Sequence, residues 1–301
     1  MMQNKNNISY EEYLELMQQE VAVRTGKRVQ LKTVRKNNGL LLDGLIILAE
    51  DTNVFPSIYL NGYYKEFLTD GLEAVAEKLI ALYEENKPEI SFDLSSIMDI
   101  SRVKPFIKMK LINYEKNQQL LETVPHIQIL DLAVVFMVVV KTEDACQLET
   151  ILVNNSFLEY WNVNVDSLYQ IAQKNMVNGF ETTALENIIV SAMGCNLEEE
   201  CLQESKFNLY VLTTHHRLHG AIGMLNKELL NAFMKKYQTE KLIILPSSIH
   251  EVLLVPYNKE DMEETDFKAM VREINETELA PEEILSNNVY LYDGKELKIF
   301  E

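Results

Sequence analysis

Apolar residues recur at helical spacing near the start of the chain. They lie three or four positions apart over five places, Tyr10, Tyr13, Leu14, Met17 and Val21, which predicts one apolar helix face. Ser9 followed three residues later by Glu12 is a capping-box pattern, and Gly26 is a typical residue just after a helix end. The pattern therefore predicts a helix over residues 9–25.

Two aliphatic, strand-like runs follow this helix. They cover residues 29–34 and 40–48, and Asn37-Asn38-Gly39 separates them; an Asn-Gly pair between such runs is a strong β-hairpin signal. An amphipathic pattern over 72–85 then predicts a second helix that ends before Pro88. We predict a helix–hairpin–helix unit over residues 1–90.

Residues 91–301 alternate between strand-like and helix-like patterns and form the predicted main domain, either separate or continuous with the first unit. Strands are expected over 106–112, 127–140, 148–153, 207–212, 220–225, 242–245, 252–255 and 289–292, and helices over 118–123, 165–176, 184–193, 228–237 and 261–275. The nine apolar residues 132–140 are too few for a membrane helix, which needs about 20, and indicate a buried strand. The predicted fold class is α+β, a mixed or antiparallel sheet with helices packed on it.

Composition predicts a folded cytoplasmic protein. Lys and Arg total 28 against 46 Asp and Glu, so the net charge is −18, and 47% of the residues are hydrophobic. Three Cys rule out a disulfide scaffold. The first seven residues are polar and unlike a signal peptide, so we expect no association with membranes.

The negative charge is concentrated near the end of the chain. Residues 259–284 contain ten acidic and three basic residues. Such a surface repels phosphate groups, so direct binding of nucleic acid is not expected. It either keeps the protein soluble or binds a partner protein with a basic surface.

One segment contains the ingredients of nucleophilic catalysis. Ser247, Ser248, His250 and Glu251 supply hydroxyl, imidazole and carboxylate groups within five residues. In a strand, Ser248 and His250 would share a face about 7 Å apart, and Glu251 would face the other way. The alternatives are a turn in which the serine hydroxyls bind backbone amides, a catalytic segment completed by a distant acid, and a ligand site.

Two further groups could bind metal. His215, His216 and His219 fall within five residues, and His215 and His219 could bind a metal together if the segment were a helix. The segment follows a strand and precedes Gly220, so a solvated loop is the expected structure. Cys195 and Cys201 lack the second ligand pair of a structural zinc site. We therefore expect no metal.

Aromatic residues gather at Tyr59, Tyr63, Tyr64 and Phe67, around Asn61-Gly62. Tyrosine combines an apolar ring with a polar tip and is common at interfaces. The group is either the packing face of a helix against the hairpin or an interface that includes Tyr59, Asn61, Tyr63 and Tyr64.

Common cofactor motifs are absent from the sequence. It has no G-x-x-x-x-G-K-[ST], G-x-G-x-x-G or H-E-x-x-H, and its 10 Gly are few for glycine-rich phosphate loops. We expect no cofactor.

Several segments resemble an uncharacterised bacterial family, a domain of unknown function common in anaerobic gut bacteria. The similarity runs from Asn37-Asn38-Gly39 through the segments LINYE (111–115), LDLAVVF (130–136) and LPSSIHEV (245–252) to Val289-Tyr290. This chain departs from the family pattern at Thr214, where the family has Asn, and at Asn162, where it has Gly. The resemblance implies no activity and transfers no catalytic role.

Two functions follow as hypotheses. The first is a non-enzymatic interaction or regulatory protein that uses the acidic surface and the tyrosine-rich segment. The second is a hydrolase or ligand-binding enzyme in which His250 is the base and Ser247 or Ser248 the nucleophile or binder, with an acid from elsewhere in the chain.

Overall fold

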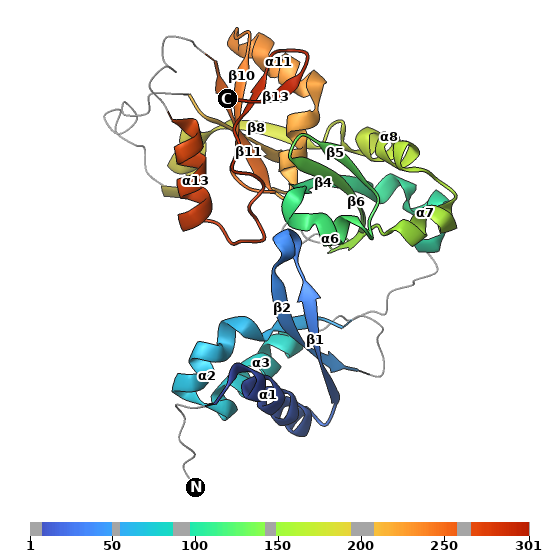
Figure 1. The fold of residues 1–301 in the computed structure, drawn as a ribbon, viewed down its shortest axis with the longest axis vertical. Coiled ribbons are helices and arrows are strands. Elements are labelled where there is room, and N and C mark those ends of the chain that lie inside the picture. The colour runs from blue at the N-terminus through green and yellow to red at the C-terminus, as the bar shows by residue number, and fades with distance from the viewer. Residues whose placement is uncertain are drawn as a thin grey trace. The chain divides into compact units, whose positions relative to one another are not determined.

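The computed structural model describes residues 8–49, 55–86, 97–141, 149–193, 208–257 and 266–300 (Figure 1). The predicted α+β fold is confirmed, because helices accompany three sheets whose described strand pairs are all antiparallel. The chain divides into two compact units. One comprises residues 1–36 and 40–95, and the other comprises residues 37–39 and 96–301.

The first unit is a three-stranded sheet with helices on one face. Its strands, in the order β1-β2-β3, are β1 (Arg28–Arg35), β2 (Leu41–Leu48) and β3 (Ser57–Tyr59). Its helical elements are α1 (Tyr10–Thr25), the short 3-10 turn η3 (Leu60–Tyr63), α2 (Tyr64–Asp70) and α3 (Leu72–Asn86).

The start of α1 has the predicted capping box. Ser9 Oγ accepts from the backbone N–H of Glu12, and the Glu12 carboxylate accepts from the N–H of Ser9. These two bonds satisfy donors that a helix start leaves free. Gly26 ends the helix with φ of 65°, which costs glycine little.

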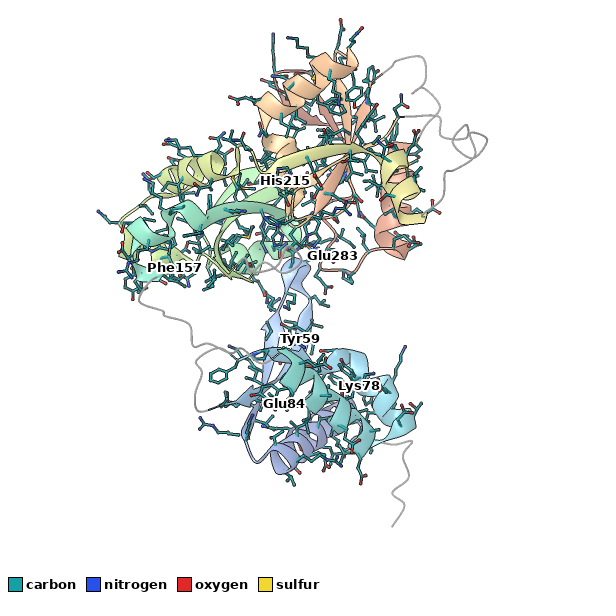
Figure 2. The ribbon with its side chains drawn as sticks, turned by 180° about the vertical axis from the view of Figure 1, so that it is seen from behind. Tyr59, Lys78, Glu84, Phe157, His215 and Glu283 are labelled. Carbon is teal, nitrogen blue, oxygen red and sulfur yellow. The ribbon has the colours of Figure 1, made fainter. Side chains whose placement is uncertain are left out.

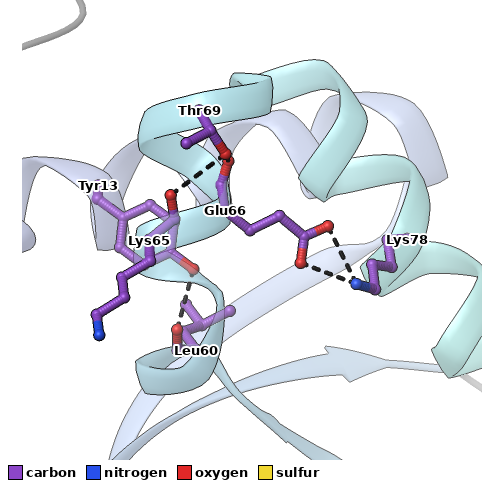
Figure 3. A network of polar contacts seen from close by, with 6 residues as sticks. All are labelled: Tyr13, Leu60, Lys65, Glu66, Thr69 and Lys78. Carbon is purple, nitrogen blue, oxygen red and sulfur yellow. Dashed lines mark hydrogen bonds and ion pairs between the residues drawn. The ribbon is translucent and has the colours of Figure 1, made fainter.

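The core of the first unit forms where α1, α2 and α3 meet one face of the sheet. Tyr13, Met17, Leu45, Ile47 and Leu79 are fully buried there. The Tyr13 hydroxyl donates to the carbonyl of Leu60 at 3.1 Å (Figure 3). At the surface, Lys78 Nζ donates to the Glu66 carboxylate at 2.8 and 3.0 Å and ties α3 to α2.

The Asn-Gly turn between β1 and β2 has left-handed backbone. In the 3-10 turn η2 (Asn37–Gly39), φ is 59° at Asn38 and 73° at Gly39. Asn and Gly tolerate this region best. The predicted hairpin pairing is present, with Arg28 opposite Leu48 and Arg35 opposite Leu41.

The first sheet of the second unit is built around one buried strand. β6 (Leu132–Lys141) lies between β4 (Ile107–Asn113) and two short strands, β5 (His126–Ile129) and β7 (Glu149–Leu152). Residues 132–139 are at most 5% exposed, which confirms the buried strand. The run predicted over 127–140 is in fact two strands, because Leu130 adopts φ of 56° and reverses the chain.

Short helices accompany this first sheet. They are α5 (Ile100–Val103), η4 (Lys104–Phe106), η5 (Glu115–Asn117), α6 (Gln118–Leu121), α7 (Asn155–Trp161) and α8 (Val165–Met176). The predicted cap of α8 is present, since Asn164 Oδ1 accepts from the N–H of Ser167 at 2.8 Å. Asn175 Nδ2 donates to the carbonyls of Lys104 and Ile107 and fastens α8 beside β4.

The second sheet of this unit has six strands in the order β13-β12-β10-β11-β9-β8. They are β8 (Phe180–Ala184), β9 (Tyr210–Thr214), β10 (Leu242–Pro246), β11 (Glu251–Pro256), β12 (Tyr290–Tyr292) and β13 (Leu297–Ile299). The accompanying helices are α9 (Leu185–Met193), η6 (Gly220–Leu225), α11 (Lys227–Tyr237) and α13 (Phe267–Thr277).

Two predicted elements of this region differ from the structure. The strand predicted over 220–225 is wrong, because η6 is a 3-10 helix. Most of its aliphatic residues are buried, and they do not form part of a strand. The helix predicted over 261–275 begins at Phe267, capped by Asp266, and residues 261–265 lie outside the described residues.

A half-buried carboxylate joins parts of the second unit that are far apart in sequence. Asp131, in the turn between β5 and β6, accepts from the Ser286 hydroxyl at 2.6 Å, the Asn288 amide at 3.0 Å and the Tyr290 hydroxyl at 2.9 Å. This contact fixes the chain entering β12 against the first sheet.

Among the described helices, none combines the length and the apolar composition needed to cross a membrane.

Candidate functional site

The sheet topology brings two candidate segments together. Antiparallel β9 and β11 are neighbours, with Thr213 opposite Glu251. Because these strands are antiparallel, the histidine-containing loop after β9 and the Ser247–Glu251 turn before β11 lie at the same end of the two strands. His215 and Glu283 are marked in this region in Figure 2.

The serine hydroxyls of the turn bind its own backbone and side chains. Ser248 Oγ accepts from the N–H of His250 at 3.0 Å, and the N–H of Ser248 donates to the carbonyl of Glu251 at 3.1 Å. Ser247 Oγ lies 3.5 Å from Glu251 Oε1. Residues 248–250 thus form a turn rather than the strand used to estimate their spacing, with neither hydroxyl bonded to the His250 ring.

One nitrogen of the His250 ring accepts a hydrogen bond, and the other lies near a carboxylate. Its Nδ1 accepts from the backbone N–H of His219 at 3.1 Å, so Nδ1 carries no proton in this arrangement and the neutral ring is protonated at Nε2. That Nε2 lies 3.8 Å from Glu283 Oε1. A Ser-His-Asp triad requires the opposite tautomer, with Nδ1–H donating to the acid and Nε2 accepting from the serine.

The backbone of His250 is bound as firmly as its ring. Its carbonyl accepts from the Gly220 N–H and from the Thr213 hydroxyl, both at 2.8 Å. A Cβ on Gly220 would lie 2.6 Å from this carbonyl oxygen and from Thr213 Cα. Only glycine allows the two segments to approach so closely.

His219 packs against His250 and is held neutral. The two rings stack with centroids 5.3 Å apart. Burial, with the nearby positive charge of Lys110 and the neighbouring His250, lowers the pKa of His219 from 6.5 to about 3. Burial also lowers the pKa of His250, and Lys110 acts in the same direction while Glu283 opposes it.

Two features of His219 indicate that it is constrained. Its φ is 54°, left-handed backbone that is uncommon for a residue other than glycine or asparagine. Its Nδ1 is buried without a hydrogen-bond partner. The loop tolerates both because the stacking and the His219 N–H bond hold it against the turn.

His215 has contacts of its own, away from His250. His215 Nε2 lies 3.1 Å from the carbonyl of Asn178, and its Nδ1 lies 3.5 Å from Glu181. His215 therefore contacts the β8 side of the sheet, whereas His219 contacts His250. Within the described residues no group of three or more His, Cys, Asp or Glu side chains could hold a metal ion. Cys195 and Cys201 lie outside those residues.

The tyrosine-rich segment divides into packing residues and surface residues. Phe67 is buried, and the Tyr64 hydroxyl donates to the carbonyl of Ile8 at 2.7 Å. Asn61 Oδ1 accepts from the N–H of Asp43 at 2.8 Å. Tyr59 and Tyr63 are half-buried, and the Nζ of Lys36 and of Lys78 lie 4.4 and 5.4 Å from their ring centres.

Sequence reasoning missed the residues that complete this region. Glu283 lies 33 positions from His250 in the sequence, and Lys110 belongs to the other sheet of the unit. No local motif marks either residue. Only the pairing of β9 with β11 places His219 beside His250.

Comparisons with known proteins give one match. A model described as a family of unknown function (DUF5688) matches residues 10–294. No curated protein and no solved structure matches the chain.

Proposed function

The chain belongs to the DUF5688 family, and we propose that it is a non-enzymatic cytoplasmic protein that acts by binding another protein. The two functions to be distinguished are protein binding and hydrolysis. The acidic residues and the Ser247–Glu251 turn, which separate the two, both lie in the second unit.

The hydrogen bonding of His250 is the observation that carries this proposal. Its Nδ1 accepts from His219, and its Nε2 faces Glu283. A general base needs a free nitrogen within hydrogen-bond reach of the proton that it removes. The serine hydroxyls nearby bind other groups, so the segment works as a structural turn.

Unpaired carboxylates support a basic partner. Glu273, Glu276, Glu278 and Glu282 are exposed or half-exposed, and in the described part of the chain none of them forms an ion pair. We call these four residues the acidic surface. Carboxylates free of cations favour a partner that supplies Lys or Arg, and such binding weakens as salt screens the charges.

A cytoplasmic location is the part of this proposal that rests on composition. Three Cys in 301 residues suit a reducing compartment, where structural disulfides are rare.

Charge-reversed protein tests the proposal. The full chain and the variant Glu276→Lys/Glu278→Lys/Glu282→Lys would be used to capture proteins from lysate at about 50 and 500 mM salt, a range across which the Debye length falls severalfold. The control Glu11→Lys/Glu15→Lys/Glu73→Lys makes the same charge change at exposed positions of the first unit. We expect a protein that the wild type and the control capture at low salt only and that the first variant does not capture. Capture that is the same for all three proteins would contradict the proposal.

A hydrolase is the second candidate because folding does bring a carboxylate, Glu283, to 3.8 Å from His250 Nε2. A fluorophosphonate probe, which labels activated serines, distinguishes the two functions. The binding proposal expects no covalent adduct by intact-mass spectrometry. An adduct on Ser247 or Ser248 that disappears in Glu283→Gln would favour the hydrolase.

A further inference from the structure

We propose that the free edge of β1 binds an extended acidic segment of a partner protein, which adds to the sheet as a fourth strand. This site belongs to the first unit, whereas the acidic surface belongs to the second. Its failure would leave the proposed function untouched, because the two sites use different residues and opposite charges.

The edge of β1 is long and accessible. β1 is the outer strand of the order β1-β2-β3 and spans eight residues. Arg28, Gln30, Lys32, Thr33 and Arg35 are exposed. Gln18 Nε2 donates to the carbonyl of Val29 at 2.9 Å, so the start of the strand is already bonded and pairing is expected from Leu31 onward. An exposed edge offers unpaired N–H and C=O groups to another strand.

The charge of this strand is opposite to that of the chain. Residues 24–36 contain six of the chain's 28 Lys and Arg and no Asp or Glu, within a protein of net charge −18. Two of the six are paired, Arg24 with Glu20 and Glu77, and Lys27 with Glu84. In the described part of the chain, Arg28, Lys32 and Arg35 have no acidic partner. A single charged side chain is enough to protect an edge strand from self-association. Three unpaired cations are more than this protection needs, and they favour an acidic ligand.

The same charges disfavour other occupants. In a second copy paired antiparallel through β1 and centred on Lys32, Lys32 would face its own counterpart and Arg28 would face Lys36. Like charges across a strand pair are destabilising. Nucleic acid would approach the carboxylates of α1, which packs on β1 and carries Glu11, Glu12, Glu15 and Glu20.

An eight-residue peptide that alternates Glu with Val is the probe. Binding to the full chain would be measured by fluorescence anisotropy at low salt, beside the same peptide with Lys in place of Glu and a single-stranded oligothymidine. We expect only the Glu peptide to bind. Lys32→Glu should weaken binding roughly tenfold, whereas Lys65→Glu, which makes the same charge change at an exposed site elsewhere, should not.

Two N-methylated peptides separate strand addition from charge attraction. An added strand uses the amides on one of its edges only, so methylating the odd or the even amides gives peptides of identical charge and different pairing. We expect one to lose binding and the other to retain it. Equal binding of both, equal binding of oligothymidine, or concentration-dependent dimers without peptide would overturn the proposal. Urea unfolding of each variant verifies that it is folded.

Discussion

At the scale of single residues, His219 links acid stability to the contact between the loop and the turn. Its pKa falls from 6.5 to about 3 on folding, so the unfolded chain binds a proton that the native protein excludes between these values. The contribution of His219 to the free energy of unfolding is therefore fully present above pH 6.5, and it is lost progressively as the pH falls toward 3. His250, whose pKa is also lowered, acts in the same direction.

The first prediction concerns the variant His219→Asn, which was chosen because asparagine tolerates left-handed backbone. Between pH 6 and pH 4, wild type should lose up to about 1 kcal/mol more per pH unit than the variant, measured by urea unfolding at each pH. His215→Asn, at an exposed position, should keep the wild-type slope. Equal slopes for wild type and His219→Asn would show that His219 is not held neutral.

Asp131 is a second residue with a large expected effect. Asp131→Ala would leave the Ser286, Asn288 and Tyr290 donors without their acceptor, and unsatisfied buried groups are costly. We expect a loss of roughly 3 kcal/mol in the free energy of unfolding. Asp70→Ala, at an exposed position, should change it little. Similar values for both variants would mean that the Asp131 contacts do not stabilise the unit.

Gly220 gives a prediction with a matched control. Gly220→Ala would place a Cβ 2.6 Å from backbone atoms of His250 and Thr213, whereas a Cβ at Gly62 would meet nothing within 4 Å. Thermal and urea unfolding should show a loss of about 2 kcal/mol or more for Gly220→Ala and little change for Gly62→Ala. A tolerated Gly220→Ala would indicate that the loop and the turn are not so close.

At the scale of secondary-structure elements, the start of α8 tests how far local signals determine the fold. Asn164→Ala removes the side-chain cap and should cost about 1 kcal/mol. Gln173→Ala, at an exposed position within the same helix, should cost nothing measurable because alanine favours helix. Equal effects would mean that the cap contributes little to the stability of α8.

Elements with strong local signals were predictable from the sequence. Three such signals are the capping box of Ser9 and Glu12, the Asn-Gly turn and the Asn164 cap. Each depends only on backbone groups a few residues away, so a short stretch of sequence is enough to predict it. η6 was not predictable because an aliphatic run suits a strand and a buried helical turn equally. The deciding contact, Gly220 against His250, joins residues 30 positions apart. In the polar strand β8 (Phe180–Ala184), apolar and polar residues do not alternate, so the sequence contained no signal for a strand.

The candidate site was predictable only in part, for the same reason. A turn at Pro246-Ser247-Ser248 follows from the residue types, and Ser248 does bind a backbone amide. The partners of the His250 ring, His219 and Glu283, come from a neighbouring strand and a later segment. Sequence spacing contains no information about them without the strand order.

At the scale of the whole molecule, charge is distributed unequally. The net charge of −18 coexists with a strand segment, residues 24–36, that carries only positive charge. The acidic surface and the basic strand belong to different units. We therefore assign binding to the charged surfaces and stabilisation of the fold to the buried polar groups.

The tautomer of His250 tests that assignment most directly. Nitrogen-15 NMR of the imidazole rings at neutral pH distinguishes a protonated from an unprotonated ring nitrogen. We predict a neutral His250 with a proton on Nε2 and none on Nδ1, because Nδ1 accepts from the His219 N–H. A proton on Nδ1, with Nε2 accepting from a serine hydroxyl, would be the arrangement of a catalytic base and would contradict it.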